Sequence, residues 1–114
     1  MCKIVTFKIG DKIINAADIK KSYIENIAEK AKGCNLIDKV VLFGSATSEN
    51  CTKESDIDIA VFGRQSESRT LRSQSYKNFV RELFKYDYSQ DYDILYFDST
   101  RNNNASILND ISSE

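Results

Sequence analysis

Residues 40–63, VVLFGSATSENCTKESDIDIAVFG, constrain the fold more than any other stretch of the chain. Two apolar runs rich in β-branched residues flank a polar segment, which predicts a strand, a loop and a second strand. The first run ends in Gly44 and Ser45, a pair typical of a tight turn. The second run opens on Asp56 and Asp58. The chain is therefore expected to fold around two strands that carry this turn and these carboxylates.

The two aspartates predict a metal site. Because side chains alternate along a strand, Asp56 and Asp58 are expected on one face and Ile57 in the core. Neighbouring carboxylates repel each other, and burying them unpaired is costly. A divalent cation removes both difficulties, and Mg²⁺ usually takes one or two carboxylates together with substrate phosphates. Gly44 permits a close backbone approach, and the Ser45 hydroxyl with nearby N–H groups suits a phosphate.

Either pair alone is more often a solvated strand end or a simple turn, so the combination carries the prediction. With residues 46–55 as spacer, it resembles the signature of the DNA polymerase β-like nucleotidyltransferase superfamily, and the chain length resembles its minimal members. The resemblance covers roughly residues 19–98. It implies a third carboxylate on a neighbouring strand, for which Asp93 is the candidate and Asp91 the rival on the same face.

The resemblance also implies a reaction, the transfer of a nucleoside monophosphate, with AMP from ATP as the leading expectation, to an acceptor hydroxyl. Asp56, Asp58 and Asp93 would be the catalytic carboxylates and would bind two Mg²⁺ ions. Gly44 and Ser45 would hold the β- and γ-phosphates of the nucleotide. Some minimal members are antitoxins that transfer AMP to a tyrosine of a helical HEPN-type protein, and such a protein is the partner that the resemblance implies.

Two alternatives stay open. Many relatives carry Arg and Gly soon after the Gly-Ser pair, where this chain has Ala46, Thr47, Ser48 and Glu49, and this departure favours a non-catalytic module that neutralises a partner by binding it. Metal-dependent glycosyltransferases also use Asp-x-Asp, although their catalytic domains are generally larger and lack this Gly-Ser spacing. Measuring the affinities for ATP and for a nucleotide sugar, each with Mg²⁺, would distinguish a nucleotidyltransferase from a glycosyltransferase.

Composition narrows the function classes further. A length of 114 residues predicts one domain, residues 1–114, with a hairpin at 1–15 and a core at 16–112. The net charge of −1 gives no pull toward nucleic acid, which is not an expected partner. The chain has no histidine, which excludes histidine-based catalysis within it. No apolar run suits a membrane span or a signal peptide, so a cytoplasmic location is expected. The scattered cysteines, Cys2, Cys34 and Cys51, predict reduced thiols.

The rest of the chain predicts an α/β (α+β) fold, a small mixed sheet of three central strands with helices against it and an N-terminal hairpin. The hairpin turns at Gly10 and Asp11, and a helix capped by Asn15 ends at Gly33. Residues 64–77 read as a solvated basic loop or, more sharply, as a phosphate or acceptor contact beside the metal site. The remaining expected elements are strands at 38–43 and 91–97, a helix at 75–86, a turn at 99–104 and a final helix around residues 107–111.

Overall fold

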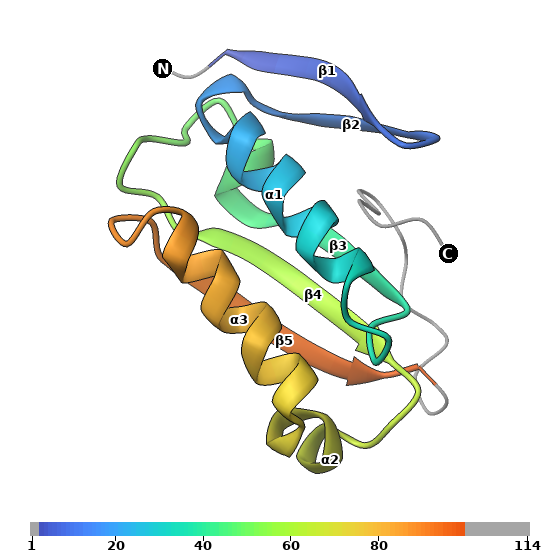
Figure 1. Ribbon diagram of the computed structural model, residues 1–114. Coiled ribbons are helices and arrows are strands. Elements are labelled where there is room, and N and C mark those ends of the chain that lie inside the picture. The colour runs from blue at the N-terminus through green and yellow to red at the C-terminus, as the bar shows by residue number, and fades with distance from the viewer. Residues whose placement is uncertain (1–2, 100–114) are drawn as a thin grey trace.

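The computed structural model describes residues 3–99, and its centre is a mixed three-stranded sheet (Figure 1). The strand order is β3-β4-β5, with β3 antiparallel and β5 parallel to β4. The elements in chain order are β1 (Ile4–Ile9), β2 (Lys12–Ala17), η1 (Asp18–Lys20), α1 (Lys21–Lys32), β3 (Lys39–Phe43), η2 (Gly44–Thr47), β4 (Ile57–Gly63), α2 (Glu67–Arg72), α3 (Gln74–Tyr86) and β5 (Tyr92–Asp98). The predicted fold class is confirmed.

The two faces of the sheet differ in what covers them. Helices α1 and α3 lie side by side over one face (Figure 1), where Ile57, Ile59 and Val61 of β4 are fully buried. The opposite face carries Asp58, Ala60 and Phe62, because alternate residues of a strand point to opposite sides. The main core therefore sits between helices and sheet, and Asp58 of β4 points away from it.

The N-terminal hairpin has the predicted turn but a longer second strand. Gly10 has φ +59, as the first turn residue between paired strands requires. β2 continues through Ala17, where Ala16 and Ala17 are fully buried. The prediction that Asn15 caps a helix was wrong: Asn15 faces Thr6 across the hairpin and accepts a hydrogen bond from its hydroxyl at 2.6 Å. The apolar surface buried by the two alanines outweighed the capping tendency of asparagine.

The basic segment that follows β4 is helical, so the prediction of a solvated loop over residues 64–77 was also wrong. The hydroxyl of Ser66 accepts a hydrogen bond from the Arg69 N–H and caps α2. Ser73 caps α3 in the same way through the N–H of Tyr76. Two serine caps close together look like a polar loop in composition, although each one begins a helix.

The other expected elements agree with the structure within a residue or two. Helix α1 ends directly before Gly33, and the third sheet strand starts at Tyr92. Cys34 and Cys51 are buried thiols. Within the described residues, no helix has the length and apolar character needed to cross a membrane. The expected turn at 99–104 and the final helix lie almost wholly outside the described part of the chain.

Candidate metal and nucleotide site

The parallel pairing of β4 and β5 places two predicted carboxylates next to each other. Asp58 and Asp93 are partners in the strand register, and both lie on the face that the helices leave open. Asp93 is exposed, and Asp56 is exposed directly before β4. Partial burial raises the pKa of the Asp58 carboxyl, and the charges of Asp93 and Asp56 raise it further. Asp58 is therefore close enough to Asp93 and to Asp56 for each of them to repel its carboxylate.

The Gly-Ser turn packs directly against Asp58. Gly44 has φ +76, and a Cβ added to it would lie 2.0 Å from Asp58 Oδ2, so only glycine leaves room for the carboxylate. The backbone N–H of Ser45 donates a hydrogen bond to that carboxylate and lowers its pKa, against the larger raising effects. The Ser45 hydroxyl donates to the Asp56 carbonyl oxygen at 3.3 Å. The short helix η2 begins at Gly44.

The charge of the three aspartates is not balanced by a neighbouring base. Within residues 3–99, the ion pairs of acidic side chains involve Asp38 and Glu82, and none involves Asp56, Asp58 or Asp93. Over the same residues, no group of three or more histidine, cysteine or carboxylate side chains is gathered closely enough to hold a metal ion by itself. The donor set nevertheless fits Mg²⁺, which needs few protein carboxylates when phosphate oxygens complete its coordination.

The structure distinguishes the two candidates for the third carboxylate. Asp93 is opposite Asp58 and contributes to its raised pKa. Asp91 precedes β5, its side chain is exposed, and its carbonyl oxygen accepts a hydrogen bond from the Ile57 N–H at 3.0 Å. The geometry therefore favours Asp93, and gives the backbone of Asp91 a structural role.

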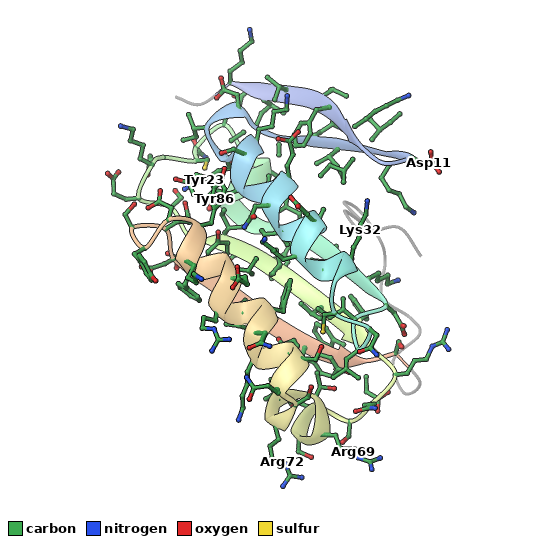
Figure 2. All side chains as sticks on the ribbon, viewed as in Figure 1. Asp11, Tyr23, Lys32, Arg69, Arg72 and Tyr86 are labelled. Carbon is green, nitrogen blue, oxygen red and sulfur yellow. The ribbon has the colours of Figure 1, made fainter. Side chains whose placement is uncertain are left out.

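The basic segment does not lie beside these aspartates. It follows the far end of β4, and Gly63 at that end is about 17 Å from Asp58 at about 3.3 Å per strand residue. Arg69 and Arg72 lie at the opposite end of the molecule from Tyr23 and Tyr86, which mark the end where β4 begins (Figure 2). The expected position of residues 64–77 beside the metal site was therefore wrong, and their contact with an acceptor protein stays a prediction.

One group of polar side chains was missed by sequence reasoning. Lys20, at the end of η1, is only 1% exposed and donates hydrogen bonds to the segments that lead into β4 and β5. Nearby, the Tyr23 hydroxyl donates to Asp87 Oδ2 at 2.5 Å. A pocket of about 460 Å³ adjoins these groups and is lined by Ile19, Lys20, Tyr23, Lys53, Asp87, Ser89 and Gln90. A lysine within an amphipathic pattern gives no signal of burial, so the sequence alone could not identify it.

Comparison with known proteins identifies the family. The model of the family described as "Polymerase beta, Nucleotidyltransferase" matches residues 25–112, well over half of the 114-residue chain. The match includes both parts of the motif and the strand that carries Asp93. Neither the curated proteins nor the solved structures gave a significant match. The chain belongs to the polymerase β nucleotidyltransferase family.

Proposed function

We propose that this chain transfers a nucleoside monophosphate, AMP from ATP, to an acceptor hydroxyl, and that the reaction depends on Mg²⁺. The observation that carries the proposal is the register pair Asp58 and Asp93, two carboxylates on the sheet face opposite the helices, without a basic partner among residues 3–99. Two bound Mg²⁺ ions would neutralise these charges and stabilise the attacking and leaving oxygens of an in-line displacement.

Each residue of the proposed site has a separate role in the reaction. Asp56 and Asp58 hold the nucleotide end of the site, and Ser45 supports both through its bonds to the Asp58 carboxylate and the Asp56 carbonyl. Asp93, the more exposed of the register pair, accepts the proton of the acceptor hydroxyl. The acceptor oxygen then bonds to the α-phosphorus, the bond to the β-phosphate oxygen breaks, and pyrophosphate leaves. Gly44 and Ser45 contact the β- and γ-phosphates.

For the acceptor we propose a tyrosine of a HEPN-type partner protein, so that the chain acts as an antitoxin. The family resemblance supports this choice. The net charge of −1 also supports it, because a chain with this charge has no general attraction for a nucleic acid acceptor.

Labelling with α-³²P-ATP and Mg²⁺, in the presence of the protein encoded beside this chain, tests the proposal. We expect label on a tyrosine of the partner, loss of label with chelator, and loss of label with Asp56→Asn. Asp91→Asn is the matched control, because it removes an exposed neighbouring carboxylate that we do not place in the site. An unlabelled partner that is still inhibited equally by the wild type and by Asp56→Asn would contradict the enzyme proposal.

That last outcome would instead support the alternative of a non-catalytic binding module. A specific observation favours this alternative. Ala46 is fully buried, and the Thr47 hydroxyl donates to the Gly44 carbonyl oxygen at 2.7 Å, so the two positions after the Gly-Ser pair offer no cation to a triphosphate. Calorimetric titration of ATP with and without Mg²⁺ separates the two functions before any partner is known, because a binding module needs no metal-dependent nucleotide affinity.

A further inference from the structure

Lys20 is buried in a way that lysine rarely is. Its side chain is 1% exposed, and its ammonium donates to the Lys53 carbonyl oxygen at 3.1 Å, to the Ser55 carbonyl oxygen at 2.8 Å and to Gln90 Oε1 at 2.6 Å. An ammonium has three hydrogens to donate, so each one has an acceptor. Burial of a charge is costly unless it is satisfied in this way, which indicates a specific role for the group.

The three acceptors lie on the two segments that lead into the carboxylate strands. Lys53 and Ser55 come three residues and one residue before Asp56, and Gln90 comes two residues before β5. Lys20 itself belongs to neither strand, because it ends the short helix η1 after the hairpin. One buried cation therefore holds the starts of both strands from outside the sheet.

Gln90 completes this connection. It is 3% exposed, and its Nε2 donates to the Ser55 carbonyl oxygen at 3.0 Å and to the Asp91 carbonyl oxygen at 2.6 Å. The Asp91 carbonyl oxygen also accepts the Ile57 N–H at 3.0 Å, the hydrogen bond next to the Asp58–Asp93 pair. We call Lys20 and Gln90 the Lys20–Gln90 clamp. Its hydrogen bonds join the two strands immediately before the positions where the carboxylates face each other.

The clamp acts against a repulsion. The pair Asp58 and Asp93 carries like charges on neighbouring strands, which favours separation of the strands at this end. The hydrogen bonds between β4 and β5 oppose this separation on the side that leads into the strands. The Lys20–Gln90 clamp opposes it on the other side, just before the strands begin. The match of the family begins at residue 25, so Lys20 lies ahead of the matched stretch.

We propose that Lys20 and Gln90 are positioning residues that hold Asp58 and Asp93 at the spacing needed to share a divalent cation with a nucleotide. The proposal rests on the proposed function, since it assumes that these carboxylates bind metal. Groups that orient metal ligands without touching the metal typically contribute about 10- to 100-fold to metal affinity. The free energy needed to hold the two carboxylates close together is supplied when the clamp forms during folding, before any ligand binds.

The test measures Mn²⁺ affinity by electron paramagnetic resonance, with a non-hydrolysable ATP analogue and at a temperature where every variant is folded. We expect Lys20→Met and Gln90→Met each to weaken Mn²⁺ binding about 10- to 100-fold. Lys30→Met is the matched control, because it removes a partly exposed ammonium from α1 that pairs with Glu82 of α3 and not with either strand start. Phe79→Leu controls for stability, because Phe79 is a buried core residue of α3.

The outcomes separate the two proposals. Loss of affinity in the clamp variants, with Lys30→Met and Phe79→Leu within about twofold of the wild type, supports the positioning role. If Lys20→Met does not fold, Gln90→Met decides alone, because it keeps the buried ammonium. Clamp variants that bind Mn²⁺ as the wild type does overturn the positioning role and leave the proposed function intact. A wild type that binds no Mn²⁺ with nucleotide overturns both.

Discussion

The two ends of β4 each depend on a closely packed glycine, but they differ in their charged groups. The charged groups are paired at the far end and repel each other at the site end. At the far end, a Cβ added to Gly63 would lie 2.4 Å from the Leu36 carbonyl oxygen and 2.4 Å from the Tyr96 hydroxyl. At the site end, defined by Gly44 and the register pair Asp58 and Asp93, the added Cβ of Gly44 would meet a carboxylate instead. Each end therefore needs a glycine, but one glycine admits neutral packing groups and the other admits a charge.

The polar groups of the far end satisfy one another. Asp38 pairs with Arg64 at 3.3 Å and accepts a hydrogen bond from the Ser99 hydroxyl at 3.1 Å, while the Tyr96 hydroxyl donates to the Gln65 carbonyl oxygen at 2.7 Å. At the site end the carboxylates of Asp58 and Asp93 repel each other. Structural polar groups are usually paired, so unbalanced like charge is the better indicator of a functional site. Arg64, which follows β4, illustrates the difference, since its charge is paired with Asp38 at the far end.

The largest expected difference between the ends is in catalysis. If the proposed function is right, Asp58→Asn and Asp93→Asn should each reduce the rate of nucleotidyl transfer by at least about a thousandfold, because each removes a proposed metal ligand that would stabilise charge in the transition state. Asp38→Asn at the far end should leave the rate of the folded enzyme within a few-fold of the wild type. Single-turnover rates with labelled ATP, normalised to folded protein, check both; equal losses at the two ends would invalidate the comparison.

Replacing each glycine by alanine should have the larger effect at the far end, the reverse of the order for catalysis, because this substitution tests packing. Gly63→Ala should lower the free energy of unfolding by about 2–3 kcal/mol, since one group in its way is backbone and cannot move aside. Gly44→Ala should cost about 1–2 kcal/mol for its positive φ, with a clash that the Asp58 side chain can partly relieve by moving. Urea denaturation measures both. Gly44→Ala should also impair Mn²⁺ binding, which Gly63→Ala should leave intact.

The raised pKa of Asp58 predicts a smaller effect on stability with a defined pH dependence. The folded-state pKa of Asp58 lies above the ordinary value of 3.8, so the folded chain binds the proton of this carboxyl more tightly than the unfolded chain does. The protonated carboxyl therefore contributes stability at low pH, and this contribution is lost as pH rises through the folded-state pKa. Asp58→Asn should therefore stabilise the metal-free protein at pH 7 by less than about 1 kcal/mol. Thermal unfolding at several pH values should show the gain vanish below pH 3.8.

Asp87, at the other side of the site end, gives the smallest and most local prediction. Hydrogen bonds from the Ser89 hydroxyl and then from Tyr23 lower its pKa to about 2, in contrast to the raised pKa of Asp58. Its stabilising contribution is present above the ordinary pKa of 3.8 and is lost as pH falls through about 2. Ser89→Ala should raise the pKa of Asp87 more than Tyr23→Phe does. Carbon-13 NMR titration of the carboxyl groups would show the reverse order if this account of the hydrogen bonds is incorrect.

The sequence predicted the strands and the carboxylates because their signals are local. Alternation around Ile57 placed Asp58 on the open face, and the apolar run after Tyr92 placed Asp93 on a strand. What could not be predicted depends on contacts between distant segments. The burial of Lys20 requires oxygens from Ser55 and Gln90, and single-residue patterns do not contain the geometry that brings them together. The far-end location of residues 64–77 likewise follows from strand direction, which composition does not reveal.

The Lys20–Gln90 clamp has a consequence for the order of events in folding. It joins residues 70 apart along the chain, and closing so long a loop carries an entropy cost that local contacts do not. The hairpin β1–β2 and the helices can form early from neighbouring residues, whereas the clamp forms only after the whole chain has condensed. We therefore expect φ-values near zero for substitutions at Lys20, with their effect appearing in the unfolding rate. The same end of the molecule should be the first to open in native-state hydrogen exchange when Lys20 is replaced.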